Sequence, residues 1–197
     1  DSNFLQSMPK TNSSVFRIGY LGTVRNQLLE FKALFEACNN LKDVRVDIHG
    51  GGIDLDSLKS MAKEYKNVYI HGPYDGVTES NNLYQNTDVA FLGYSVENVN
   101  YQGEFEPVKY FEAILTSTPI IATKSLNIGL QVEKNVIGVA VNTQNPAEIE
   151  KAILMLKDDG DFFSTCREKM KAMAPLYDWN EVVKVLDDIY LKSKNYE

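Results

Sequence analysis

Cysteine and histidine are scarce in this chain of 197 residues, which contains two of each. Cys38 and Cys166 have no paired spacing and lie in segments with a helical pattern. We therefore expect free thiols in a reducing compartment and no disulfide framework. His49 and His71 lie at the ends of two different predicted strands, and for that reason we expect no metal site.

Long apolar runs and runs of like charge are also absent from the sequence. No stretch approaches the roughly 18 apolar residues that span a bilayer, and no signal-peptide pattern is present. The net charge is −7, and without a basic cluster nucleic-acid binding is not expected. The remaining composition, 44% hydrophobic and 24% charged residues, is ordinary for one globular domain.

Short apolar segments alternate along the chain with segments of helical periodicity. The predicted strands cover residues 15–21, 44–48, 68–70, 89–92, 119–122 and 136–141. The predicted helices cover residues 28–38, 55–62, 78–86, 107–116, 146–156, 162–173 and 179–191. This alternation is typical of βαβ units. It predicts an α/β fold, a Rossmann-like parallel sheet of about six strands with helices on both faces.

The first segment, residues 1–14, is polar and irregular and begins at Asp1 rather than at a methionine. We expect it to be a linker from a longer protein, followed by a single domain over residues 15–197. In such sheets ligands bind in the crevice beyond the carboxyl ends of the strands, so the loops that follow the strands are the places to search for a site.

The segment 103–121, between the fourth and fifth predicted strands, is the most informative one. Pro107 suits the first position of a helix, where a missing N–H costs nothing. The amides of that first turn, including Val108, would point into the crevice and favour a phosphate. Lys109 adds a cation, and Glu112 lies about one and a half turns along the helix from its start, where it could accept two hydrogen bonds from a vicinal diol such as a ribose. Glu104, in the preceding loop, could reach a sugar hydroxyl.

This segment resembles the motif of two glutamates, eight positions apart, in retaining glycosyltransferases of family four with the GT-B fold. Glu104 and Glu112 have that spacing, and the places of the variant Pro-x-Lys-x-x-Glu followed by a Pro and two apolar residues are filled by Pro107, Lys109, Glu112, Pro119, Ile120 and Ile121. The resemblance implies that Glu112 binds the ribose and Glu104 the transferred sugar. Ser117, Phe105 and Glu106 depart from the glycines common in the family.

Other segments carry the same resemblance. Residues 19–25 resemble the first strand and loop of these donor domains, where glycines admit a diphosphate and a basic side chain neutralises it; here that side chain is Arg25. Residues 49–52 resemble the glycine turn after the second strand, and residues 68–72 the stretch that shapes the base pocket. Residues 177–179 resemble the family's ending, where the final helix, residues 179–191, crosses back toward the other domain.

The resemblance implies that the chain is the carboxyl-terminal, nucleotide-sugar-binding half of a GT-B glycosyltransferase. The expected donor is a UDP-sugar, with retaining transfer to an acceptor hydroxyl in bacterial polysaccharide or glycolipid synthesis. The implied catalytic residues are Glu104, Arg25 and Lys109, and the implied ligand-binding residues are Gly22, Thr23, Arg25, Gly50, Gly51, Gly72, Pro107, Val108, Lys109 and Glu112. No metal or cofactor is expected. The acceptor would bind a missing amino-terminal domain, and the enzyme would be cytoplasmic or peripheral to the inner face of the membrane.

Two alternatives from other classes stay open at this point. The first is a fragment of a sugar-nucleotide epimerase with the GT-B fold, although that class would need more acid and base residues than this chain offers. The second is a non-enzymatic Rossmann-like nucleotide-binding module. Individual residues have structural alternatives too: Arg25 as a surface residue, Glu104 as a loop charge, and residues 50–52 as a tight connection. Tyr74, Tyr94 and Tyr101 are candidates for lining the base pocket, and the sequence does not select among them.

Overall fold

A computed structural model describes residues 14–98, 101–104, 106–178, 183–184 and 190. Six parallel strands form one sheet in the order β3-β2-β1-β4-β5-β6, which confirms the predicted α/β fold. The strands are β1 (Phe16–Leu21), β2 (Val44–His49), β3 (Val68–Gly72), β4 (Val89–Leu92), β5 (Ile120–Thr123) and β6 (Gly138–Val141). All but one residue of the predicted linker, and most of the predicted helix 179–191, lie outside the described residues.

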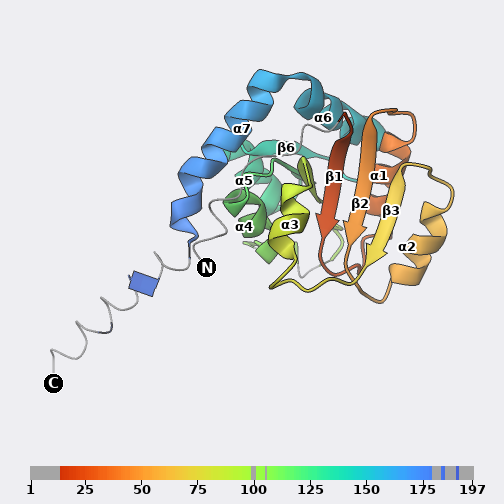
Figure 1. The fold of residues 1–197 in the computed structure, drawn as a ribbon, viewed down its shortest axis with the longest axis horizontal. Helices are drawn as coiled ribbons and strands as arrows, with labels where there is room; N and C mark the ends of the chain where they lie inside the picture. Colours follow the sequence, from red (N-terminus) through yellow and green to blue (C-terminus); the bar gives the residue numbers. More distant parts are fainter. Residues whose placement is uncertain (1–13, 99–100, 105, 179–182, 185–189, 191–197) are drawn as a thin grey trace.

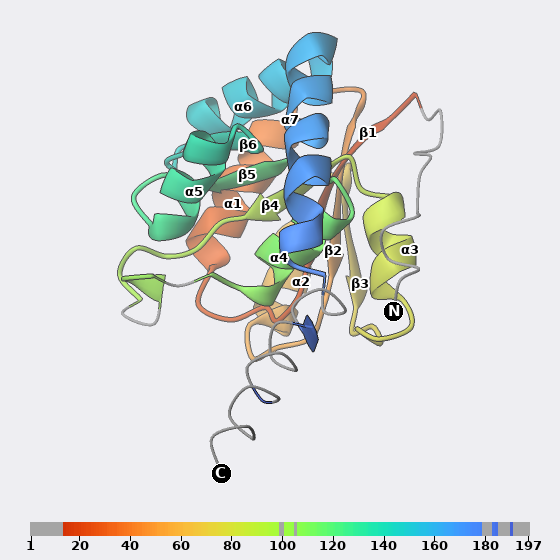
Figure 2. The same ribbon diagram turned by 90° about the vertical axis from the view of Figure 1, so that its left-hand side faces the viewer.

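The helices cover the sheet from both sides (Figure 1). They are α1 (Leu28–Cys38), α2 (Leu55–Ala62), α3 (Ser80–Gln85), α4 (Val108–Leu115), α5 (Asn127–Asn135), α6 (Pro146–Asp158), α7 (Gly160–Met173) and the short 3-10 helix η3 (Ala174–Leu176). Helices α1, α2 and α6 pack on one face around one hydrophobic core, and α3, α4 and α5 pack on the other around a second. Helix α7 lies beside α6 and α4 (Figure 2) and contributes Cys166 to the first core and Met170 to the second.

The second face of the sheet changes character from one half to the other. On β4 and β5 this face is apolar, with Ala90, Leu92 and Ile120 in the second core. On β2 and β3 it is polar, because every second residue there is Arg45, Asp47, His49, Tyr69 or His71. These five residues are called the polar strand face below. Helix α3 is only six residues long, three shorter than the predicted helix 78–86, and it contacts β1.

The loops that follow β1, β2 and β3 are held together by backbone hydrogen bonds. The Gly22 amide donates to the His49 carbonyl at 2.9 Å, and the Gly50 amide donates to the Gly72 carbonyl at 2.7 Å. The Val24 amide donates to the Gly51 carbonyl at 2.8 Å. The backbones approach so closely that a Cβ atom on Gly50, whose φ is +152°, would collide with the Gly22 carbonyl oxygen. Gly50 and Gly51 therefore shape the platform of strand-end loops.

Gly50→Ala should destabilise the fold by about 2–4 kcal/mol, because backbone atoms must move to admit the methyl group and the φ is unfavourable for alanine. The midpoint of urea unfolding, at unchanged slope, measures this. Gly160→Ala is the matched control, since a Cβ there meets nothing within 4 Å, and we expect little change or a slight gain in the helix. Equal midpoints for the two variants would contradict the steric role of Gly50.

The structure has one helix that the sequence does not predict, and some element boundaries differ from the predicted ones. No element was expected between β5 and β6, where the structure has α5. This helix contains Gly129, and glycine is a poor helix former. A side chain does not fit at this position, since a Cβ there would lie 2.8 Å from Lys124 Cα. Its end at Val136, with a left-handed φ of 54°, also shortens the predicted strand 136–141.

Two expected helix starts also differ in detail. Pro107 is the residue before α4, with an extended ψ of 153°, rather than its first helical residue. The sequence offers Asp54 or Asp56 as a cap for α2; Asp54 is the residue before the helix, but its side chain makes no capping hydrogen bond. Instead, its carboxylate accepts the backbone N–H of Asn26 at 2.6 Å and so ties the β1–α1 loop to the start of α2.

Candidate functional site

Helix α4 begins beside the strand-end loops, as the sequence predicted. Within its first turn, the Tyr110 amide donates to the Pro107 carbonyl at 2.9 Å. The amides of Val108 and Lys109 precede this bond at the start of the helix. Because helix starts carry a partial positive charge and N–H groups that lack helical partners, this end of α4 suits an anion. The Val108 side chain is exposed and that of Pro107 is buried, and of these two residues only Val108 has a backbone N–H to offer an anion.

Lys109 reaches from α4 across to the β1–α1 loop. Its Nζ lies 3.8 Å from the centroid of the Tyr20 ring and 5.4 Å from that of Tyr94. A Cβ on Gly22 would lie 2.7 Å from the same Nζ, so the absence of a side chain at Gly22 makes room for the ammonium group. Burial lowers the pKa of Lys109 from 10.5 to about 7, and Glu112 opposes this shift. An ammonium with so little water around it would gain strongly from an anionic ligand.

Glu112 lies one turn along the same helix and is held by a buried tyrosine. The Tyr84 hydroxyl lies 3.2 Å from Glu112 Oε2, to which it can donate, and 3.3 Å from the Lys109 carbonyl. Burial raises the pKa of Glu112, while the Tyr84 hydrogen bond and Lys109 act against that shift. Glu112 also raises the pKa of the Tyr74 hydroxyl, after burial, which places Tyr74 near this carboxylate. The contact with Tyr84 was not predicted, because a tyrosine in a helix looks the same in sequence whether it packs or positions a carboxylate.

The structure brings Gly22, Lys109 and Glu112 together, whereas the side chains of three other predicted site residues are exposed. Arg25 and Thr23 are exposed, and among the described residues the Arg25 side chain makes no hydrogen bond or ion pair. Glu104 is also exposed, in the loop 101–104. Of the three tyrosines considered, Tyr94 and Tyr101 are buried with ring centroids 4.6 Å apart, and Tyr74 is half-buried beside the site. Gly72, with a φ of +85°, ends β3 next to Pro73 and Tyr74.

A hollow of about 500 Å³ lies on the other side of the β1–α1 loop, at the start of α1. Its lining includes the carboxylates of Glu30, Asp54 and Glu97. Three acidic groups would repel a diphosphate. The anion-binding chemistry of the strand-end crevice therefore lies at Lys109 and the start of α4.

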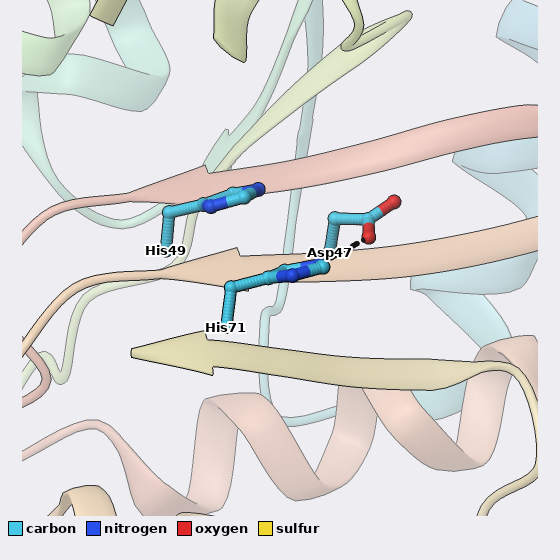
Figure 3. A group of neighbouring side chains, drawn as sticks. All are labelled: Asp47, His49 and His71. Carbon is cyan, nitrogen blue, oxygen red and sulfur yellow. Dashed lines mark hydrogen bonds and ion pairs between the residues drawn. The ribbon is translucent and has the colours of Figure 1, made fainter. Parts of the chain in front are cut away.

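A second group of polar side chains lies on the polar strand face. Asp47, His49 and His71 offer ligand atoms that all lie within 4.8 Å of one another (Figure 3). The two imidazole rings stack with centroids 4.2 Å apart and an angle of 4° between their planes. His71 Nε2 lies 2.6 Å from Asp47 Oδ1. The sequence places these histidines at the ends of two different strands, and no local pattern shows that β2 and β3 are neighbours in the sheet.

The chain thus combines a parallel sheet in doubly wound order with a helix start, a half-buried lysine and a carboxylate beyond the strand ends, which is where ligands bind in open α/β sheets. The chain belongs to the family "Glycosyl transferases group 1", whose model matches residues 6–174. A comparison with curated proteins gave no match.

Solved structures of glycosyltransferases share the fold. HepE of Anabaena, in complex with UDP and glucose, is 17% identical with a TM-score of 0.73, and the match covers 98% of this chain and 54% of that one. TarM of S. aureus is 16% identical with a TM-score of 0.72, over 94% of this chain and 37% of that one. The C-terminal domain of LpcC from Francisella tularensis is 18% identical with a TM-score of 0.64, over 82% and 85%. The chain thus spans about half the length of HepE, and its predicted likeness to a GT-B carboxyl-terminal domain is confirmed.

Proposed function

We propose that this chain is the donor-binding domain of a retaining glycosyltransferase and binds a nucleoside diphosphate sugar. The observation that carries the proposal is the pair Lys109 and Glu112 on the first turns of α4, with the Lys109 ammonium against Gly22. A cation and a diol-binding carboxylate one helical turn apart match the diphosphate and the ribose of one ligand. Uridine is the proposed base, in keeping with the UDP bound in the HepE structure.

In this proposal the diphosphate lies between the start of α4 and the loops at Gly22 and Gly72. When the bond between the sugar's anomeric carbon and the diphosphate oxygen breaks, negative charge grows on the leaving diphosphate. Lys109 and the amides at the helix start stabilise that charge, so no metal ion is required for it. Tyr74 lies beside the base, Glu104 contacts the transferred sugar, and Arg25 folds in from the exposed loop onto the phosphates.

The acceptor, in this proposal, binds a second domain and the cleft between the two. The whole enzyme would transfer its sugar to a hydroxyl during polysaccharide or glycolipid synthesis on the cytoplasmic side of the membrane. Any attachment to the membrane would come through the second domain. Among the described residues, no helix has the length and apolar character of a membrane span.

The test is calorimetric titration of the chain with UDP, GDP and ADP, each compared with its monophosphate. We expect one diphosphate to bind with the highest affinity, and its monophosphate to bind more weakly, because Lys109 faces the diphosphate. The isolated chain should bind without transferring sugar to any acceptor. Absence of binding by all three diphosphates would contradict the proposed donor site, and measurable transfer by the isolated chain would contradict the need for a second domain.

A further inference from the structure

Both histidines of this chain meet in one place, on the polar strand face. They come from different strands, His49 from the end of β2 and His71 from β3, and the sequence contains no others. Parallel pairing and the register shift after Ile48 bring their rings into a stack with Asp47 beside them (Figure 3). A cavity of about 240 Å³ opens in front of them, and its lining is completed by Arg17, Arg45, Leu83, Asn86 and Thr87.

An ion pair alone explains only part of this arrangement. Asp47 Oδ1 accepts from Arg45 at 2.6 and 2.9 Å and lies 2.6 Å from His71 Nε2. These contacts satisfy the carboxylate without His49. Nevertheless His49 lies parallel to His71, although two neighbouring imidazoles disfavour each other's protonation. The His49 ring lines the cavity, and a neutral imidazole offers a nitrogen lone pair for a ligand bond.

Two imidazole nitrogens and one carboxylate oxygen are a common ligand set for zinc. Such ligands lie about 2.0–2.2 Å from the ion and so about 3.3 Å from one another in a tetrahedral site. The ligand atoms of the three groups lie within 4.8 Å of one another, so side-chain rotations that move them by about an ångström bring them to the separations of a tetrahedral site. Among the described residues, the hydrogen bonds of Asp47 all go to Oδ1, which leaves Oδ2 for the metal, with Arg45 orienting the carboxylate from behind.

We propose that Asp47, His49 and His71 bind one divalent transition-metal ion of the zinc class, with its fourth position open to the cavity. The site is separate from the one at Lys109 and does not depend on the proposed donor binding. It meets the donor platform where the His49 carbonyl accepts the Gly22 amide at 2.9 Å and where the His49 ring packs edge-on against Tyr74, with centroids 6.4 Å apart.

The test uses the chain without a histidine tag, stripped with a chelator and titrated with ZnCl₂ by calorimetry. We expect one zinc ion per chain, and His49→Asn and His71→Asn should each weaken binding by more than about tenfold. Asp161→Asn, which removes an exposed carboxylate from α7, is the control and should leave zinc affinity unchanged. Cys38 and Cys166 are buried in the folded chain and do not compete.

A second measurement does not depend on the variants folding. In the wild-type chain, the only imidazole NMR signals come from His49 and His71, and both should shift together with one equivalent of zinc. Zinc binding that persists in the His49→Asn/His71→Asn double variant, or imidazole signals that do not respond to zinc, would overturn the proposal. Substitution with Co²⁺ should give the visible bands of a four-coordinate site, and octahedral bands would place the ion outside this cluster.

Discussion

Lys109→Met is expected to weaken UDP binding about 10- to 100-fold when measured below pH 7. A charge-assisted contact contributes about 1.5–3 kcal/mol, and methionine keeps the packing against Tyr20 while removing the charge. Calorimetric titration measures the change. Lys151→Met, which removes an exposed lysine from α6 on the opposite face of the sheet, is the matched control. Equal loss of affinity in both variants would show that Lys109 does not face the ligand.

The same lysine predicts how binding depends on pH. Burial lowers its pKa to about 7, so the ammonium form, which attracts the diphosphate, is lost as pH rises through that value. The affinity of the wild type for UDP should therefore fall above pH 7, with uptake of a proton on binding. This fall in affinity should be missing in Lys109→Met. A pH-independent wild-type affinity across this range would contradict the burial of the ammonium.

The free energy of unfolding of the ligand-free protein should rise with pH over the range in which the affinity for UDP falls. The folded-state pKa lies below the ordinary 10.5, so between about 7 and 10.5 the unfolded chain holds this proton more firmly than the folded chain. The cost of burying the charge is complete below pH 7 and disappears as pH rises through that window. Relative to Lys109→Met, the wild type should therefore gain stability toward alkaline pH, which urea unfolding at several pH values would detect.

Glu112→Gln is expected to reduce UDP affinity about tenfold or more, because the amide can accept only one strong hydrogen bond where the carboxylate accepts two from the ribose diol. Glutamine keeps an oxygen for the Tyr84 hydroxyl, so stability should change little. Titration with UDP and with 2′,3′-dideoxy-UDP separates the effects: the variant should lose affinity for UDP and almost none for the dideoxy analogue.

Glu133→Gln, at an exposed position of α5, is the control for this substitution. An equal loss for UDP and the dideoxy analogue would contradict a ribose contact and would indicate that Glu112 acts only through Lys109. Because burial raises the pKa of Glu112, the wild-type affinity for UDP should also begin to fall at a higher pH, on the acid side, than an ordinary glutamate would allow.

Periodic signals in the sequence were enough to predict most of the fold. Strand β4 was predicted with the bounds that it has in the structure. A short apolar segment between two turns is too short for a helix, so a strand is the natural prediction. The motif around Lys109 and Glu112 also predicted the helix that presents these two side chains beside the strand-end loops. Local chemistry determines these features, since each depends on residues within one or two turns of one another.

The features that escaped prediction depend on contacts between distant segments. Helix α5 was missed because Gly129 lowers its helical propensity, and only the approach to Lys124 explains that glycine. The stack of His49 on His71 requires the register between β2 and β3, which no local pattern contains. Likewise, no local pattern shows that Gly50 and Gly51 let neighbouring loops touch, a structural role separate from the ligand contacts predicted for them.

Helix α4 fixes the spacing between the two contacts proposed for the nucleotide. Lys109 and Glu112 are three residues apart on a single rigid helix, so their separation along its axis is about 4.5 Å whatever the rest of the enzyme does. The helix acts as a ruler that spaces the phosphate contact from the sugar contact of a nucleotide. Opening and closing of a two-domain enzyme would thus leave the contacts of Lys109 and Glu112 with the nucleotide unchanged. Only the groups that contact the transferred sugar would change.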